Sequence, residues 1–404
     1  MNLETKEAIV NKSNLEVEKN DLKKLYLEIT SHCNLNCTMC TRKNWQNEGI
    51  GHMSKATFSK VLKDLPNHPE LKTVFLGGIG EPLTHPDLIE MITALCKRDL
   101  RVEMISNGTL LTKEMSGKLI DAGLNMLWVS VDGAFSVCYE DIRQGATANN
   151  LYKNLEGLCE AKIERGIFDV HIYDLNEYLA RETLQLGLAF VAMKRNIKEL
   201  PKLIQESRKL GVREIKVTHV IPYTKEMVNE ALYDRTVLLN HGQPRDPLVM
   251  HVDLPLMDWN EDTTNVMAAL YNSHATFSHM DIPMLRRENY CRFVQEGQSF
   301  VRWDGEICPC MALLHDGKTY LNNVERHITG KSFGNINDND KSLSKIWYGE
   351  EYSEFRKKVR DFVYSPCVTC GECTYLEDNQ EDCYGDTFPT CGGCLWAQGL
   401  VQCP

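Results

Sequence analysis

Short apolar stretches alternate with amphipathic ones along the first half of the chain. Apolar runs rich in β-branched and aromatic residues predict buried strands, and apolar residues spaced three and four apart predict helices. Six strands are expected, at 22–30, 73–76, 102–106, 127–131, 186–193 and 214–221, and helices at 53–65, 87–97, 112–122, 150–165 and 197–209. This repetition predicts a parallel α/β sheet or barrel, with its chemistry at the carboxyl ends of the strands.

Two stretches interrupt the repetition. Residues 167–185 separate the fourth helix from the fifth strand, and residues 222–289 are long and mixed in composition. A structureless loop of the second length is uncommon inside a compact domain, so we expect helices there and a cover over the active site. Further on, Asp304-Gly305 predicts a hairpin turn, and 342–360 has helical spacing.

Composition and charge narrow the class of protein. The chain has 404 residues, enough for one large barrel or two to three ordinary domains, and 43% of them are hydrophobic. Its net charge of −11 argues against broad nucleic-acid binding. No apolar run is long enough for a membrane span, and the polar residues 1–21 do not resemble an export signal. We therefore expect a cytoplasmic protein with neither nucleic acid nor membrane as a partner.

The chain contains 16 cysteines, and their distribution is uneven. In a reducing compartment, metal or redox chemistry is a better interpretation of so many cysteines than a disulfide framework. Cys96, Cys138 and Cys159 are isolated, and we expect them to be structural. The others form a cluster near the start of the barrel and a larger group at the end of the chain.

The first cluster has the spacing C-x3-C-x2-C, formed by Cys33, Cys37 and Cys40 directly after the first expected strand. A four-iron cluster normally takes four protein thiolates, so three would leave one iron open. Catalytic metal sites keep such a vacant position for a ligand. A zinc knuckle or unrelated thiols are the alternatives, and the position after the first strand of an α/β repeat disfavours both.

This cysteine loop resembles the signature of the radical S-adenosylmethionine (SAM) superfamily. The resemblance implies a partial (β/α)6 barrel, in which the open iron binds the amino and carboxylate groups of SAM. It also implies that an electron from the reduced cluster cleaves SAM to methionine and a 5′-deoxyadenosyl radical, which abstracts hydrogen from a substrate. The domains implied are a polar lead-in (1–21), the barrel (22–222), an insertion for substrate recognition (223–290) and an auxiliary iron–sulfur domain (291–404).

The resemblance extends to the ends of the other expected strands. Residues 77–82, Gly-Gly-Ile-Gly-Glu-Pro, resemble the family's methionine-binding segment, whose glycines let the backbone approach the ligand. Ser130 and Asp132 resemble a polar pair near the ribose or methionine moiety, and turn capping is the alternative. Arg143 resembles an arginine near the cofactor carboxylate, with a surface salt bridge as the alternative. The SAM-binding residues implied are Gly77, Gly78, Gly80, Glu81, Asn107, Ser130, Asp132, Arg143 and Asn196.

The late cysteines resemble the SPASM extension, a module with two further four-iron clusters. Cys291, Gly305 and Cys310 match its opening, but the later spacing departs from the usual one, so the partition of ligands stays open. The auxiliary ligands implied are Cys291, Cys310, Cys367, Cys370, Cys373, Cys383, Cys391, Cys394 and Cys403. Our preferred partition places Cys367, Cys370 and Cys373 with a late cysteine, and Cys291 and Cys310 with Cys383. Zinc is the alternative, since two C-x2-C pairs have nearly zinc-ribbon spacing.

The tail at 389–399, with the closing Cys403-Pro404, resembles radical enzymes grouped as maturases of tungsten-containing oxidoreductases. This resemblance implies action on such an oxidoreductase or its cofactor, with a reducing ferredoxin or flavodoxin as electron donor. One alternative is a SPASM-type enzyme that modifies a peptide or a sulfatase, with Asp253 or Asp258 accepting the substrate proton. For these acids, a solvated surface is the competing interpretation. Another alternative is an electron-transfer protein with three clusters.

Overall fold

The structure is a computed structural model of the full chain. It describes residues 21–45, 48–134, 137–167, 184–233, 251–255, 257–258, 260–271, 276–279, 291–321, 324–361, 377–382, 385, 387–391, 394–397 and 399–404.

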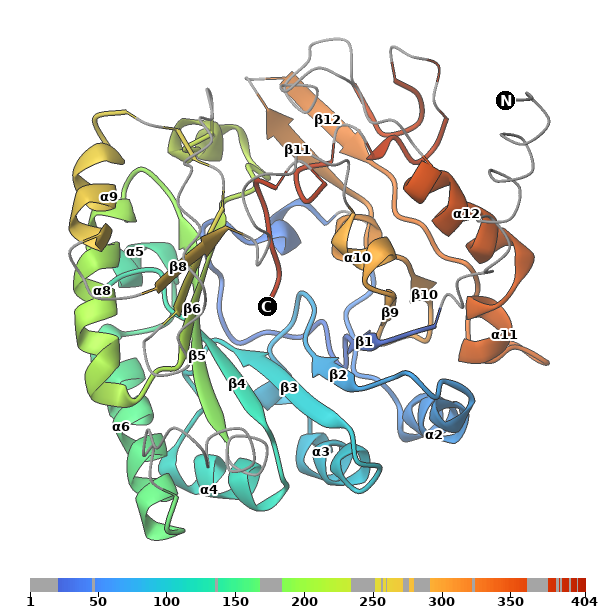
Figure 1. Ribbon diagram of the computed structural model, residues 1–404, viewed down its shortest axis with the longest axis horizontal. Coiled ribbons are helices and arrows are strands. Elements are labelled where there is room, and N and C mark those ends of the chain that lie inside the picture. The colour runs from blue at the N-terminus through green and yellow to red at the C-terminus, as the bar shows by residue number, and fades with distance from the viewer. Residues whose placement is uncertain are drawn as a thin grey trace, which may run out of the picture.

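A curved ten-stranded sheet forms the centre of the molecule, with the order β10-β9-β1-β2-β3-β4-β5-β6-β7-β8 (Figure 1). All neighbouring strands are parallel except β9 and β10. The strands are β1 (Lys24–Leu27), β2 (Thr73–Leu76), β3 (Arg101–Ser106), β4 (Met126–Ser130), β5 (Gln185–Ala192), β6 (Glu214–His219), β7 (His251–Leu254), β8 (Thr276–His279), β9 (Gln298–Val301) and β10 (Ile307–Cys308).

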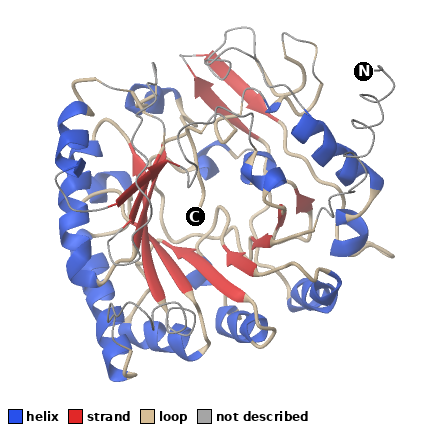
Figure 2. Cartoon of the chain, in the orientation of Figure 1, coloured by secondary structure: helices blue, strands red, loops and turns tan. Residues whose placement is uncertain are grey.

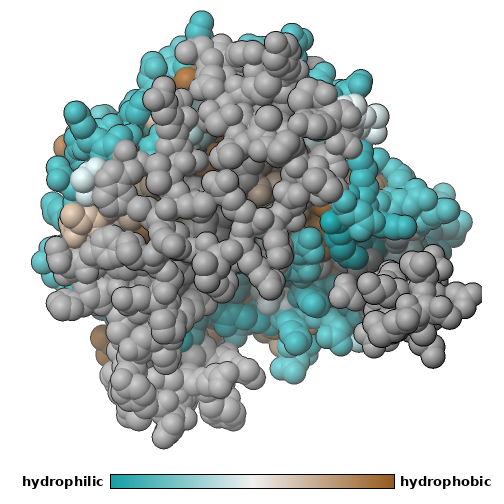
Figure 3. Space-filling model, turned by 45° about the horizontal axis from the view of Figure 1, so that its top comes forward, coloured by the Kyte–Doolittle hydropathy of each residue, from teal (hydrophilic) through white to brown (hydrophobic). Residues whose placement is uncertain are grey.

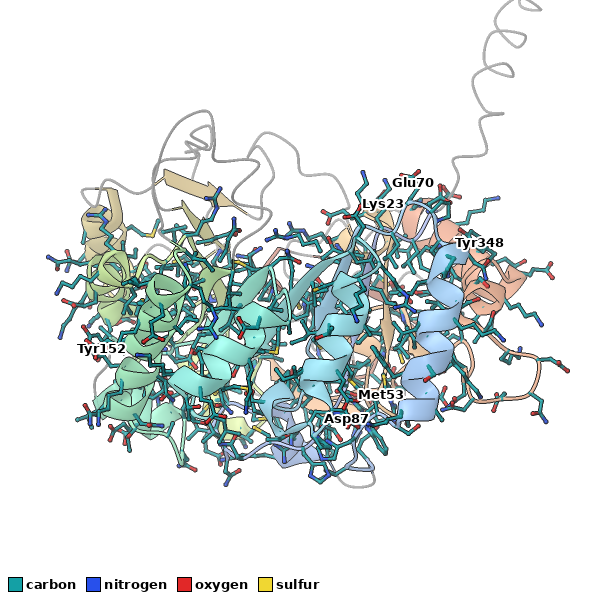
Figure 4. The ribbon with its side chains drawn as sticks, turned by 90° about the horizontal axis from the view of Figure 1, so that it is seen from below. Lys23, Met53, Glu70, Asp87, Tyr152 and Tyr348 are labelled. Atoms are coloured by element: carbon teal, nitrogen blue, oxygen red, sulfur yellow. The ribbon has the colours of Figure 1, made fainter. Side chains whose placement is uncertain are left out.

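Helices cover the outer face of this sheet (Figure 2). They are α2 (Lys55–Asp64), α3 (Leu88–Cys96), α4 (Lys113–Asp121), α5 (Val137–Ile142), α6 (Ala148–Glu164), α8 (Leu200–Ser207) and α9 (Thr264–Tyr271). Ser54, Thr112 and Thr147 cap the starts of α2, α4 and α6, because each side chain accepts a hydrogen bond from a backbone N–H of the first turn. The side view in Figure 4 shows Lys23, at the amino end of β1, on the opposite edge from Met53 and Asp87.

The strand pattern follows from burial on both faces. In β3 every second residue is buried (Val102, Met104 and Ser106), whereas in β4 every residue is buried. Inside the curve of the sheet Tyr26 stacks on Phe300 with ring centroids 4.3 Å apart. Packing of this kind is typical of a parallel barrel, whose interior is filled by side chains and is not a pore.

The C-terminal part of the chain continues the sheet instead of forming a separate layer. Strand β9 pairs in parallel with β1, and β10 returns beside it through the turn at Gly305, which has a φ of +96°. The remaining elements there are α10 (Arg292–Gln295), α11 (Leu343–Trp347), α12 (Glu350–Asp361) and the hairpin β11 (Gly317–Leu321) with β12 (Val324–Ile328). The predicted partial barrel followed by a small cysteine-rich domain is confirmed.

Three sequence-based expectations need correction. The insertion contains strands β7 and β8 in addition to helix α9, so the sheet is larger than the predicted six strands. The single helix expected over 342–360 is two helices, because the chain breaks at Gly349 between α11 and α12. Helix α5 was not predicted. Most of the first interruption, 168–183, lies outside the described residues.

The described surface is mainly hydrophilic on the face shown in Figure 3. Large exposed hydrophobic side chains in the described ranges are scattered, with Val137 the most exposed at 74%. None of the helices in those ranges is long and apolar enough to cross a bilayer.

Candidate functional site

The loop that carries Cys33, Cys37 and Cys40 is bonded to the chain that follows α5. The N–H of Asn36 donates to Gln144 O at 3.0 Å, and that of Thr38 donates to Ile142 O at 2.9 Å. Burial raises the pKa of Cys40, and the neighbouring Cys33 adds to the rise. Burial likewise raises the pKa of Cys37, and Cys40 and Cys33 add to the rise, so the three thiols lie close to one another in the loop after β1.

A buried ion pair lies beside this loop. Arg143 Nε and Nη2 are each 2.7 Å from Asp132 Oδ2, and Asp132 Oδ1 accepts the N–H of Val191 at 2.7 Å. The Asp132 side chain is fully buried and that of Arg143 is 9% exposed. Burial alone would lower the pKa of Arg143, but the Asp132 carboxylate and the Cys37 thiolate raise it, so the guanidinium stays charged. The same charge opposes the rise in the pKa of Cys37 that burial causes.

The glycine-rich segment packs against the start of the cysteine loop. A Cβ added at Gly78 would lie 2.6 Å from Glu28 Cγ, and one added at Gly80 would lie 2.7 Å from His32 O. The N–H of Glu81 donates to His32 O at 2.7 Å. Only glycine allows the backbone at Gly80 to approach the backbone of the cysteine loop this closely, and only glycine leaves room for the Glu28 side chain at Gly78.

Glu81 and Asn107 join the ends of β2 and β3 to the cysteine loop. The buried Glu81 carboxylate accepts hydrogen bonds from Ser106 Oγ (2.9 Å) and from the N–H of Asn107 (2.6 Å). The Asn107 amide donates to Asn34 Oδ1 at 2.9 Å and lies 3.9 Å from Cys33 Sγ. Asn107 is therefore beside the predicted cluster, whereas the Glu81 carboxylate is engaged with β3.

Two predicted SAM-binding residues differ in their surroundings. Ser130 ends β4 and is 9% exposed. Asn196 is fully buried, and its amide donates to Asp132 O (3.1 Å) and Val191 O (2.8 Å) while accepting the N–H of Met193 (2.7 Å). These contacts indicate that Asn196 braces the ends of β4 and β5.

Four cysteines of the C-terminal domain come together: Cys291, Cys310, Cys391 and Cys394. Burial raises the pKa of Cys310, and the adjacent Cys394, Cys291 and Cys391 raise it further. Burial raises the pKa of Cys291, and Cys394 adds to the rise, which a backbone hydrogen bond from Val294 opposes. Burial also raises the pKa of Cys391, and Cys291 and Cys394 raise it further. In every pair among the four, the charge of one thiolate is therefore close enough to raise the pKa of the other. Four thiolates are the complete protein ligand set of a four-iron cluster.

These thiols do not form a site for a single metal ion. Within the described ranges, no three histidine, cysteine or acidic side chains are close enough together to hold one ion. A four-iron cluster makes a different demand, because each thiolate binds its own iron and the sulfurs stand further apart. The two donor sets, one of three thiols and one of four, therefore fit clusters in number and kind.

One cavity is lined both by barrel residues and by the second group of cysteines. On the barrel side its lining includes Thr41, next to Cys40, and Ile79 of the glycine-rich segment. On the other side its lining includes all four thiols of the second group, with His315 and Trp396.

Cys403 lies apart from these sets, inside the curve of the sheet, where Figure 1 shows the C-terminal end of the chain. Trp396 Nε1 donates to Cys403 Sγ at 3.3 Å, and Pro404 O accepts hydrogen bonds from Tyr26 Oη (3.0 Å) and Lys24 Nζ (3.2 Å). The other predicted ligands, Cys367, Cys370, Cys373 and Cys383, lie outside the described residues.

The remaining candidates lie elsewhere in the fold. Asp253 is on β7, in register with Lys216 of β6, and its side chain is not among the described ones. Asp258 is buried, and its backbone N–H donates to Leu232 O at 2.9 Å. Burial raises the pKa of Cys96 to about 11, so it is a neutral thiol, as expected of a structural cysteine.

Two residues near this site, Glu28 and His315, were not predicted from the sequence. Glu28 is fully buried at the end of β1, and His315 lines the cavity. An acid within the apolar stretch 22–30 was the available signal for Glu28, since buried acids are rare unless paired. His315, five positions after Cys310, carried no local signal, because its partners are distant in sequence.

Comparison with known sequences agrees with this arrangement. The sequence model of the radical SAM superfamily matches residues 27–186, and that of SPASM, an iron–sulfur cluster-binding domain, matches residues 291–374. The chain is 32% identical over 391 residues to the tungsten-containing aldehyde ferredoxin oxidoreductase cofactor-modifying protein of Pyrococcus furiosus. That alignment covers 95% of this chain and 97% of the relative. The PqqA peptide cyclase of Gluconobacter oxydans is 23% identical, with 86% of this chain and 82% of the relative covered.

A solved structure shares the fold. Streptococcus suis SuiB bound to precursor peptide SuiA superposes with a TM-score of 0.57 at 13% identity, covering 95% of this chain and 77% of that one. The similarity extends over both the barrel and the C-terminal domain.

Proposed function

The chain belongs to the radical SAM superfamily, and from that premise we propose that Cys33, Cys37 and Cys40 hold the cluster that binds SAM. It also carries a SPASM domain and is an iron–sulfur enzyme. The observation that carries the proposal is the three-thiol loop, which lies beside Asn107 and the glycine-rich segment. Three thiolates complete three irons and leave the fourth for SAM.

The chain's own residues prepare this site in three ways. Arg143 places a positive charge beside Cys37, which favours the thiolate that binds iron. Gly78 and Gly80 let the glycine-rich backbone lie close to the cysteine loop. The side chain of Asn107, which follows β3, holds Asn34 of that loop through a hydrogen bond. When bound, the reduced cluster and SAM supply a 5′-deoxyadenosyl radical for hydrogen abstraction.

We propose that Cys291, Cys310, Cys391 and Cys394 hold an auxiliary cluster. Their mutual proximity supports this grouping. With four thiolates no iron is left open, so this cluster would carry electrons and would not bind substrate directly. Cys367, Cys370, Cys373 and Cys383 are the remaining candidates for a second auxiliary cluster.

The target that we propose is a tungsten-containing oxidoreductase or its cofactor. Support comes from the Pyrococcus furiosus relative, whose name describes modification of such a cofactor and whose sequence aligns over nearly all of this chain. Modification of a peptide is the second candidate, supported by the PqqA peptide cyclase. A reducing ferredoxin or flavodoxin is the proposed electron donor.

Co-expression tests the target. A tungsten-containing aldehyde oxidoreductase is produced with this protein, without it, and with its Cys37→Ser variant. The proposal predicts that oxidoreductase activity, or the mass of its extracted cofactor, changes only with the intact protein. Identical oxidoreductase in all three preparations would contradict it and favour a peptide substrate.

A further inference from the structure

An imidazole of the C-terminal domain lies between two carboxylates of the barrel. His315 follows the short helix η7 (Met311–Leu313), and its side chain is 5% exposed. Its Nε2 is 3.0 and 3.2 Å from the two oxygens of Glu28, and its Nδ1 is 3.0 Å from Glu48 Oε2. Glu28 precedes the three cluster cysteines in sequence and Glu48 follows them. His315 thus holds both ends of the cysteine loop.

These contacts require one proton more than a neutral imidazole carries. Each nitrogen faces a carboxylate oxygen, and a hydrogen bond needs a hydrogen between them. A neutral ring has only one N–H, so the group holds either an imidazolium or a protonated carboxyl group. Burial alone would lower the pKa of His315, but its hydrogen bonds to Glu28 and Glu48 outweigh that effect and raise it. The raised pKa favours the imidazolium form, which can donate one hydrogen bond to each carboxylate.

His315, Glu28 and Glu48 together form a bridge, which extends to the glycine-rich segment through Glu28. Glu28 Oε1, one of the oxygens that contacts His315, also accepts the N–H of Ile79 at 3.1 Å. Gly78 packs on the Glu28 side chain, with no room for a Cβ between them. A shift of His315 would therefore move the backbone of the segment proposed to bind SAM.

On its other side the bridge is fixed to the C-terminal domain. Glu48 accepts the N–H of Asp316 at 3.1 Å and lies 3.5 Å from Arg302. The ring of Trp45 rests on that of His315, with centroids 4.5 Å apart. His315 also lines the cavity that contains the four thiols of the auxiliary site. This imidazole of the auxiliary domain thus contacts Glu28, Trp45 and Glu48 and also lines the cavity.

We propose that His315 is a positioning residue that couples the auxiliary domain to the SAM site. By bridging Glu28 and Glu48 it sets the position of Ile79, and with it the glycine-rich backbone next to the open iron. The inference rests on the proposed SAM site and adds that the C-terminal domain tunes it. Occupancy of the cavity or of the auxiliary site would then alter SAM binding through this bridge.

The test is a SAM titration of the reduced, iron-loaded full-length protein, followed by electron paramagnetic resonance. SAM changes the signal of a cluster whose open iron it binds. The His315→Gln side chain has a similar length but is neutral. It has a single donor group, so it cannot donate from two sides of a ring as the imidazolium does. We expect the SAM concentration at half-maximal change to rise about 5- to 150-fold, the usual range for coupled sites. Total iron and the signal of the auxiliary clusters are expected to stay unchanged.

Two further variants make the result decisive. His327→Gln changes an exposed histidine of the same domain, with 64% side-chain exposure, and should titrate like the wild type. Glu48→Gln keeps an acceptor for the N–H of Asp316 and removes one carboxylate, so it should shift the titration in the same direction as His315→Gln.

Three outcomes would overturn the inference. The first is a wild-type titration curve for His315→Gln and Glu48→Gln. The second is loss of auxiliary iron in both variants, because His315 would then only hold the domain together. A wild-type protein whose signal does not respond to SAM would refute the proposed function itself, and the inference with it.

Discussion

Replacing Asp132 with asparagine removes one charge from the ion pair beside the cysteine loop. The Asp132 side chain is fully buried and holds Arg143 through two contacts of 2.7 Å. Asparagine has the same shape and keeps an oxygen for the N–H of Val191, which aspartate binds at 2.7 Å. The substitution therefore removes both the charge and the oxygen that accepts from Arg143, while the size of the side chain stays the same.

The expected cost follows from the burial of the pair. Removing one partner leaves the Arg143 cation buried without its counter-ion, which typically costs about 3–5 kcal/mol. That is a large share of the roughly 5–15 kcal/mol by which domains are stable. Because Arg143 also lies beside Cys37, the uncompensated cation is expected to disturb the loop and reduce the iron that it holds.

Urea unfolding of the anaerobic protein, followed by circular dichroism, measures this cost. Asp121→Asn is the matched control, since Arg165 contacts Asp121 at 2.7 Å but the Asp121 side chain is 62% exposed. Exposed pairs contribute little, so the control should unfold near the wild-type urea concentration, and Asp132→Asn well below it. Equal unfolding midpoints for the two variants would refute the claim that the buried Asp132–Arg143 pair contributes more to stability than an exposed pair does.

Other predictions test the remaining parts of the site. Gly80→Ala should lower the iron content by about four per chain, because its Cβ would overlap Thr30 O, and full iron loading would contradict this. Cys391→Ser should likewise remove about four irons per chain, whereas Cys403→Ser should not, and iron analysis of the two variants compares them. The pKa of His315 is raised, so its stabilising effect is complete below the unfolded value of about 6.5 and is lost as pH rises through the folded pKa. The stability difference between wild type and His315→Gln should therefore shrink from about pH 6 to 9, and a constant difference would disprove the assignment.

The sequence predicted those parts of the fold whose defining residues are close to one another along the chain. Strands such as β4, buried along its whole length, stand out as apolar runs, and C-x3-C-x2-C identifies the cysteine loop because its residues are close in sequence. Strands β7 and β8 were missed because each of their short sequences, HVDL and TFSH, mixes polar with apolar residues. Their strand structure comes from pairing with neighbours, which no short window reveals.

The grouping of the late cysteines depends on tertiary contacts. Cys391 and Cys394 meet Cys291 and Cys310 although about a hundred residues of chain separate Cys291 from Cys391. The preferred partition from the sequence placed Cys383 with Cys291 and Cys310, and Cys383 lies outside the described residues. Asn196 shows the same limit, because its place after β5 resembled a SAM-binding position, whereas its hydrogen bonds are to the backbone of the strand ends.

Reductive cleavage of SAM tests the central claim most directly. The iron-loaded protein is reduced without oxygen and mixed with SAM, and methionine and 5′-deoxyadenosine are quantified beside a Cys37→Ser control. The claim predicts both products from the wild type and neither from the variant. Absence of both products from fully iron-loaded, reduced wild type, or equal amounts from the two proteins, would contradict it.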